Sequence, residues 1–135
     1  MSEFRWPIRV YYEDTDAGGV VYHANYLNYY ERARTEWLRA KGFEQDELRD
    51  EEKLIFAVRR VSIDYDLPAR FNDELEVISN IEEIKTTRMY FQQQIFKTDG
   101  TRINTATVEV VAIHSELFKA TRIPDHILQE IIDVD

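Results

Sequence analysis

The residues with the clearest potential for chemistry lie between positions 13 and 23. Three carboxylates, Glu13, Asp14 and Asp16, stand just before the glycines Gly18 and Gly19, and a strongly patterned helical segment follows. Glycines let the backbone approach a ligand closely, and the first turn of a helix presents free N–H groups that stabilise developing negative charge. A carboxylate facing such a helix start could serve as a general base toward water or attack an acyl carbon itself. It could equally be a turn carboxylate satisfied by neighbouring N–H groups, and the local pattern leaves both readings open.

Other catalytic sets are poorly supported by the sequence. The chain has no cysteine, which excludes disulfides, thiolate metal sites and a cysteine nucleophile. No serine stands in a G-x-S-x-G turn, and no G-x-x-x-x-G-K-[ST] phosphate loop is present. The three histidines, His23, His114 and His126, are far apart and follow no H-x-x-x-H spacing, so we expect no metal site.

Composition narrows the class of protein. The chain has 135 residues, which favours a single domain over 1–135 with a sizeable core. Its 26 acidic against 17 basic residues give a net charge of -9, which opposes nucleic-acid binding. No segment approaches the ~20 apolar residues needed to cross a bilayer, and the N-terminus resembles no signal peptide. We therefore expect a cytoplasmic protein without membrane insertion.

Hydrophobic periodicity predicts the elements around the acidic turn. Alternation predicts a strand over 4–12, and an aromatic stripe at helical spacing predicts a helix over 26–41 with Asn25 as N-cap. Gly42 suits the left-handed position that ends a helix, with Phe43 making the accompanying apolar contact. The acidic segment 44–53 could be a short helix or a loop. Further strands are predicted over 54–67, 74–84, 89–97 and 102–114, and a helix over 124–134 with Pro124 in its first turn.

This order of elements predicts an α+β domain in which a five-stranded antiparallel sheet covers one long central helix, with a short C-terminal helix. One helix leaves much of such a sheet bare, so apolar strand residues could face either side and favour self-association. These residues are Ile78, Tyr90, Phe96, Val108 and Val110.

One long stretch carries a family resemblance. The sequence RVYYEDTDAGGVVYHANYLNYYERARTEWL resembles the signature of hotdog-fold acyl-CoA thioesterases, in the Tol-Pal-associated YbgC-type branch related to 4-hydroxybenzoyl-CoA thioesterase. The likeness continues through VRRVSIDYDLPARFND to VEVVAIH and so covers nearly the whole chain. It implies the hotdog fold, a long helix wrapped by a five-stranded antiparallel sheet. It also implies dimers that extend the sheet and often pair into tetramers.

The same resemblance implies roles for residues of the turn. Asp16 stands at the family's catalytic carboxylate, Gly19 permits the tight turn, and the backbone N–H of His23 polarises the thioester carbonyl. Tyr22 and His23 would line the acyl end of the pocket; Tyr-His-Ala stands here in place of the benzoyl-CoA branch's Trp-Tyr-Pro, which argues against an aromatic acyl preference. Whether the His23 side chain assists, or only its N–H matters, stays open. Glu31 is a weaker candidate for an assisting base.

The resemblance also implies a binding path for the coenzyme. Phe56, Ala57 and Val58 would flank the pantetheine, and Thr86, Thr87 and Arg88 would meet the nucleotide end. Because an anionic cofactor bound to a protein of net charge -9 needs a local positive patch, further cations are candidates for phosphate contacts. They are Arg59, Arg60, Lys119 and Arg122. Surface cations paired with the many acids are an equally good interpretation of each.

The sequence thus leads to the hypothesis of a cytoplasmic, homo-oligomeric acyl-CoA thioesterase without metal or redox cofactor, CoA being part of the substrate. An acyl carrier protein is an alternative thiol partner. Two rival functions remain: a hotdog hydratase acting on acyl thioesters, and a non-catalytic module that binds an acyl thioester or an acyl carrier protein.

Overall fold

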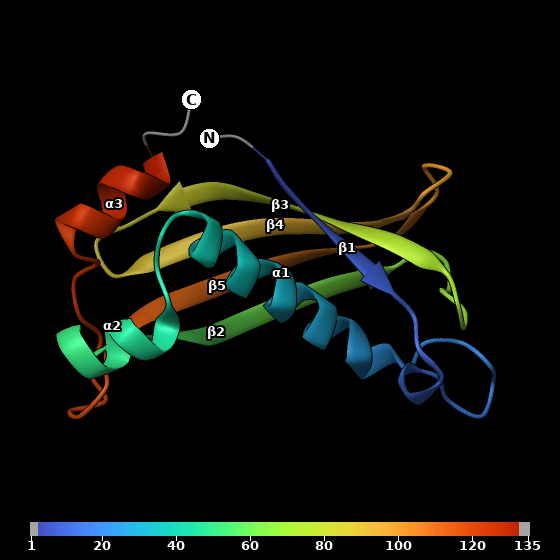
Figure 1. Cartoon of the computed structure of the whole chain (residues 1–135), viewed down its shortest axis with the longest axis horizontal. Coiled ribbons are helices and arrows are strands. Elements are labelled where there is room, and N and C mark those ends of the chain that lie inside the picture. Colours follow the sequence, from blue (N-terminus) through green and yellow to red (C-terminus); the bar gives the residue numbers. More distant parts are fainter. Residues whose placement is uncertain (1–2, 133–135) are drawn as a thin grey trace.

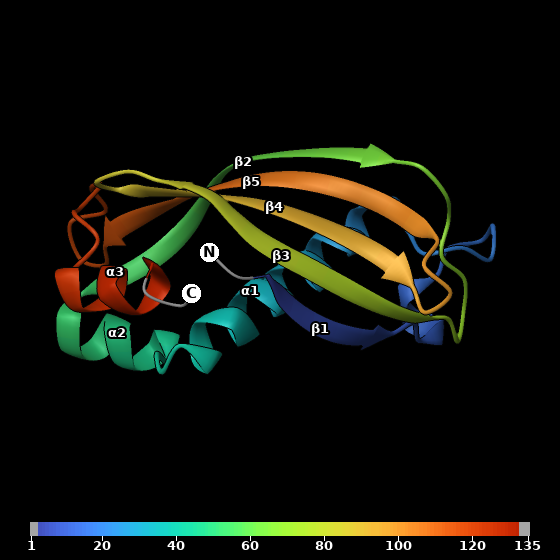
Figure 2. The same cartoon turned by 90° about the horizontal axis from the view of Figure 1, so that it is seen from above.

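Five antiparallel strands form one sheet in the computed structural model, which describes residues 3–132. The order across the sheet is β1-β3-β4-β5-β2, so β1 and β2 are its two edges. The strands are β1 (Phe4–Arg9), β2 (Leu54–Tyr65), β3 (Glu74–Ile84), β4 (Arg88–Lys97) and β5 (Arg102–His114). The sheet arches over one long helix, α1 (Tyr26–Ala40), as Figures 1 and 2 show. The predicted hotdog arrangement is therefore confirmed.

Helix α1 buries a wide aromatic stripe against the sheet. Tyr29 and Tyr30 are fully buried, and the Trp37 ring meets Phe91 of β4 edge to face, with centroids 5.2 Å apart. The helix ends as predicted: Gly42 has φ +99°, its N–H donates to Arg39 at 2.9 Å, and the N–H of Phe43 donates to Leu38 at 3.1 Å. This pair of hydrogen bonds satisfies the last carbonyls of the helix.

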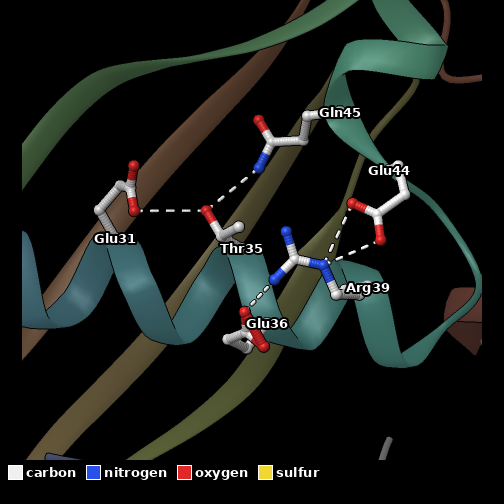
Figure 3. A network of polar contacts seen from close by, with 6 residues as sticks. All are labelled: Glu31, Thr35, Glu36, Arg39, Glu44 and Gln45. Carbon is white, nitrogen blue, oxygen red and sulfur yellow. Dashed lines mark hydrogen bonds and ion pairs between the residues drawn. The ribbon is translucent and has the colours of Figure 1, made fainter.

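The acidic segment after α1 is a helix, α2 (Gln45–Glu52), and polar contacts hold it beside the end of α1. The guanidinium of Arg39 contacts Glu36 and reaches the Glu44 carboxylate at 2.9 Å (Figure 3). Gln45 donates to the hydroxyl of Thr35 at 3.2 Å, and that hydroxyl donates to Glu31 at 3.3 Å (Figure 3). Exposed pairs of this kind contribute little to stability, but together they fix where α2 begins.

The C-terminal helix α3 (Asp125–Ile132) lies beside α2 at one end of the sheet, and the segment that joins β1 to α1 lies at the other (Figure 1). The N–H groups of Ile127 and Leu128 both donate to the carbonyl of Pro124. Pro124 therefore precedes the helix, and its predicted place inside the first turn was wrong by one position. The predicted end of this helix at 134 lies outside the described residues.

The end of the first strand and the start of α1 differ in detail from the predictions. The predicted strand 4–12 stops at Arg9, because Tyr12–Asp14 forms a 3-10 helix, and Tyr12 is 80% exposed instead of facing the core. Asn25 stands at the N-cap position of α1 as predicted, but it has helical backbone angles and its side chain makes no capping hydrogen bond. Its side-chain amide instead donates to the carboxylate of Asp14.

The two faces of the sheet are now distinguished. Val108 and Val110 pair with Phe91 and Met89 and are buried on the face toward α1. The opposite face carries Ile78, Tyr90 and Phe96, which are half-buried; Ile78 pairs with Gln94, whereas Tyr90 and Phe96 pair with Glu109 and Glu76. No helix among residues 3–132 is both long and apolar enough to span a membrane.

A small polar network crosses the core between α1 and the sheet. Gln93 of β4 is fully buried; its side chain donates to the Tyr30 carbonyl and to the hydroxyl of Ser79, and accepts from Arg34 at 2.9 Å. Burial lowers the pKa of the Arg34 guanidinium to about 10, an effect that the Glu31 carboxylate opposes. Gln93 thus supplies interior partners to groups that would otherwise lose water without compensation.

We predict that Gln93→Leu lowers the free energy of unfolding by at least ~2 kcal/mol, because Arg34 and Ser79 lose a buried partner. Chemical denaturation measures the change. The matched control is Gln92→Leu, one residue away on the opposite face and half-exposed, which should stay within ~0.5 kcal/mol of the native chain. Equal losses in the two variants would contradict a structural role for the network.

Candidate active site

The acidic turn is a short loop whose two sides are joined by backbone hydrogen bonds. An isolated bridge joins Thr15 to Val21, and the N–H of Asp16 donates to the Val20 carbonyl at 2.9 Å. The loop closes through the N–H of Gly19, which donates to the Asp16 carbonyl at 3.0 Å. Gly19 has φ +79°, a conformation that costs an L-residue with a side chain ~1–2 kcal/mol, so the glycine is explained by the turn.

Asp16 is exposed, and its carboxylate is divided between two environments. Oδ1 accepts the N–H of Gly18 at 2.8 Å, which anchors the side chain to its own turn. Oδ2 has no hydrogen-bond partner among residues 3–132. A Cβ atom at Gly18 would lie 3.2 Å from Oδ1, so this close approach favours glycine. One oxygen therefore has the structural role of a turn carboxylate, and the other makes no hydrogen bond within the described residues.

Of the three acids in the turn, Asp14 has a structural role. It is buried; its Oδ2 accepts the N–H of Tyr11 at 2.8 Å, and its Oδ1 accepts the amide of Asn25 at 2.9 Å. Its backbone carbonyl also accepts the N–H of Tyr22 at 2.9 Å. Burial, followed by the nearby Asp14 carboxylate, raises the pKa of Tyr29. The acidic turn is thereby clamped to the start of the helical segment at several points.

His23 begins the 3-10 helix His23–Asn25 that leads into α1. Within the described part of the chain, no acceptor is found for its backbone N–H. Its imidazole is exposed and tilts against the ring of Tyr22, with centroids 4.6 Å apart. Tyr22 is itself 48% exposed, so both side chains predicted to line the acyl end lie at the surface of this chain.

The residues predicted to flank the pantetheine lie on edge strand β2 and point in two directions. Phe56 and Val58 face α1 and line a cavity of about 130 Å³ between the helix and the sheet edge, together with Glu31. Ala57 is exposed and pairs with Val111, whose side chain belongs to the other face. The strand bulges between Val58 and Arg60, which breaks the alternation there.

Two predicted cation candidates, far apart in sequence, meet at a carboxylate that the sequence analysis did not single out. The guanidinium groups of Arg59 and Arg88 lie 3.0 and 3.3 Å from the same Oε2 of Glu109. The Glu109 side chain is only 9% exposed, whereas the two arginine side chains are 48% and 39% exposed. The isolated acid inside the apolar run VEVVAI could have signalled such a site. One carboxylate between two cations leaves a net positive patch.

Between described residues, no side-chain hydrogen bond or ion pair joins the remaining coenzyme candidates to this patch. The Thr86 carbonyl accepts the N–H of Ile123, and the Thr87 carbonyl accepts the N–H of Ala112 in β5, so both bonds tie down the β3–β4 connection. Arg122 pairs with Asp125 at 3.2 Å on the surface, as the simpler interpretation anticipated. Lys119 lies in an exposed loop, and Arg60 pairs with Glu109 in the strand register. No group of three or more metal-ligating side chains is found within residues 3–132.

Comparisons with known proteins agree with this architecture. Residues 10–131 match the model of the thioesterase-like superfamily. The chain is 46% identical over 127 residues to the acyl-CoA thioester hydrolase YbgC of Escherichia coli O6:H1, covering 94% of each. It is 42% identical over 124 residues to the acyl-CoA thioesterase YbgC of Haemophilus influenzae, covering 92% of this chain and 90% of that one.

A solved structure extends the comparison to three dimensions. A probable thioesterase from Bartonella henselae superposes with a TM-score of 0.86 at 35% identity, over 91% of this chain and all of that one. The fold is therefore shared over nearly the full length. The chain belongs to the thioesterase-like superfamily, with relatives of the YbgC type.

Proposed function

We propose that this protein hydrolyses acyl-CoA to a free carboxylic acid and CoA in the cytoplasm. The observation that carries the proposal is that Oδ2 of Asp16, in the acidic turn, and the backbone N–H of His23, just after that turn, both lack a hydrogen-bond partner within residues 3–132. The YbgC relatives, whose names state this activity, support it.

The proposed mechanism assigns separate tasks to the two groups. The His23 N–H donates to the thioester oxygen as it gains negative charge, in a position where the start of a helix adds a favourable dipole. Asp16 either removes a proton from a water that attacks the carbonyl carbon, or attacks that carbon itself to form a mixed anhydride, which water then cleaves to regenerate the carboxylate. In either route the C–S bond breaks, its electron pair leaves with the CoA sulfur, and the thiolate takes up a proton derived from water. Both routes need only groups that this chain supplies, without a metal or redox cofactor.

The central test removes the charge of Asp16 while keeping its turn. Asp16→Asn retains an oxygen that can accept the Gly18 N–H, so the fold should persist, while kcat for acyl-CoA hydrolysis should fall at least ~10²-fold. Thiol release across a panel of acyl-CoA substrates is the measurement. Glu13→Gln, an exposed acid in the same turn, is the control and should keep its activity.

Near-native hydrolysis of every acyl-CoA by the Asp16 variant would reject the mechanism. A native chain that binds acyl-CoA without releasing thiol would instead be a binding module, and one that hydrates enoyl-CoA would be a hydratase. Single turnover in ¹⁸O-labelled water separates the two roles, because only nucleophilic attack places label in the Asp16 carboxylate.

The Arg59–Arg88 patch is the proposed contact for the phosphates of CoA. Arg88→Ala should raise KM at least fivefold, equivalent to ~1 kcal/mol for a partly exposed charge-assisted contact, and change kcat less. Arg59 still pairs with Glu109 in this variant, so the buried carboxylate keeps a partner. Arg49→Ala, which removes an exposed cation from α2, is the control. Steady-state kinetics in which KM is unchanged would remove Arg88 from the site.

We further propose that the functional unit is at least a dimer formed through β2. Among residues 3–132 this edge strand pairs only with β5, and side chains on its α1-facing side stay exposed: Val58 47%, Val61 36% and Tyr65 50%. An edge strand of twelve residues with exposed apolar side chains invites pairing with a second copy, which would extend the sheet.

Introducing a charge on this edge should separate the copies. Val61→Lys should shift the mass measured by light scattering from a multiple of 16.1 kDa to 16.1 kDa itself, because a lysine at the edge opposes strand pairing. Thr98→Lys, in the exposed β4–β5 turn, adds the same charge elsewhere and should leave the assembly intact. A native chain that is monomeric, or a Val61 variant that keeps its mass, would contradict the proposed edge.

A further inference from the structure

Tyr65, the last residue of β2, reaches across to the start of the helical segment. Its hydroxyl donates a hydrogen bond of 2.9 Å to the backbone carbonyl of His23. Its ring packs against the ring of Tyr26, with centroids 5.8 Å apart and planes inclined by 59°. Tyr26 is itself fixed, because it is buried and its hydroxyl accepts the N–H of Ala69 at 3.1 Å. The direction of the Tyr65 hydroxyl is therefore set by the core.

Hydrogen bonds hold the peptide groups on both sides of His23. The N–H of Tyr22 donates to the Asp14 carbonyl at 2.9 Å, and the carbonyl of Tyr22 accepts the N–H of Asn25 at 2.8 Å. The N–H of His23 shares a rigid, planar peptide group with that Tyr22 carbonyl. The next peptide group carries the His23 carbonyl, which Tyr65 holds from outside the turn. Consequently, the proposed oxyanion donor lies between two anchored groups, and Tyr65 supplies the anchor that comes from the sheet.

The surroundings of this contact place it beside the proposed chemistry. Tyr65 and His23 line an open hollow of about 290 Å³, and its other walls are mainly apolar. Those walls come from Val21, Tyr26, Asp66, Leu67 and Pro68. The one carboxylate there, Asp66, is paired with Arg102 at 2.9 Å. The Tyr65 hydroxyl donates to the His23 carbonyl, so its single proton is not available to a substrate.

We infer that Tyr65 is a positioning residue for hydrolysis: through its hydroxyl it holds the His23 peptide so that the backbone N–H is aligned before the substrate arrives. The inference rests on the proposed function. A donor that is already oriented stabilises the transition state without reorganisation, whereas a loosened one must be ordered during the reaction. The contribution should therefore fall on kcat and leave KM nearly unchanged, because the substrate carbonyl is uncharged in the ground state.

The test compares Tyr65→Phe with Tyr12→Phe. The first removes the hydroxyl and keeps the ring on Tyr26; the second removes a hydroxyl from an exposed tyrosine at the same end of the molecule. For Tyr65→Phe we expect kcat to fall about tenfold with KM within twofold, a partial share of the 10²–10³-fold effect of deleting an oxyanion donor. Amide hydrogen exchange of residues 23–25 should become faster, with the thermal midpoint preserved. Tyr12→Phe should change none of these quantities.

Unchanged kcat and unchanged exchange in Tyr65→Phe would overturn the inference. A variant that loses kcat only together with a matching rise in KM and a fall in thermal midpoint would also overturn it, because that pattern marks general destabilisation. If the native chain hydrolyses no acyl-CoA, the proposed function fails separately, and the exchange measurement still decides whether Tyr65 holds the turn.

Discussion

The buried carboxylate of Asp14 is the contact on which the arrangement of the turn depends. Its two oxygens take hydrogen bonds from the Tyr11 backbone and the Asn25 side chain, so one group joins the end of the first strand segment to the start of the helix. A buried carboxylate is costly unless its lone pairs are satisfied, and here neighbouring donors satisfy them. The loop between these anchors, which carries Asp16, is therefore closed at its base and free only at its tip.

Two neighbouring aspartates of the turn differ in burial and in hydrogen bonding. Asp14 and Asp16 are two residues apart, yet the Asp14 carboxylate is buried and accepts two hydrogen bonds, whereas Asp16 is exposed and one of its oxygens has no partner within residues 3–132. A catalytic group needs an atom that is not already hydrogen-bonded within the protein, and surrounding contacts that hold it rigidly in place. In the proposed mechanism Asp14 provides the support, and Gly18 leaves the space beside the Asp16 carboxylate that a side chain would narrow.

The same logic extends along α1 to the edge of the sheet. The helix is anchored beneath by the Gln93 network and at its start by the turn, whereas strand β2 beside it keeps an exposed apolar side. The cavity lined by Phe56 and Val58 and the contact of Tyr65 with His23 both lie along this seam between helix and edge. A second copy paired on β2 would cover the seam, so assembly and site are expected to depend on each other.

The sequence by itself determined the fold and the bounds of most elements, because those follow from local periodicity and from glycines with special backbone angles. The α1 ending at Gly42 and the bounds of β3 and β5 are examples. The resemblance, carried by the run around Asp16, also singled out one acid from three. Only the tertiary structure decided what depends on contacts between distant residues. It buried Asp14 and bonded the Asn25 amide to it in place of a capping contact. It also joined Arg59 and Arg88 at Glu109, and it brought the Tyr65 hydroxyl to the His23 carbonyl. Such contacts leave no local pattern, because they join residues that the chain brings together only when the sheet closes over the helix.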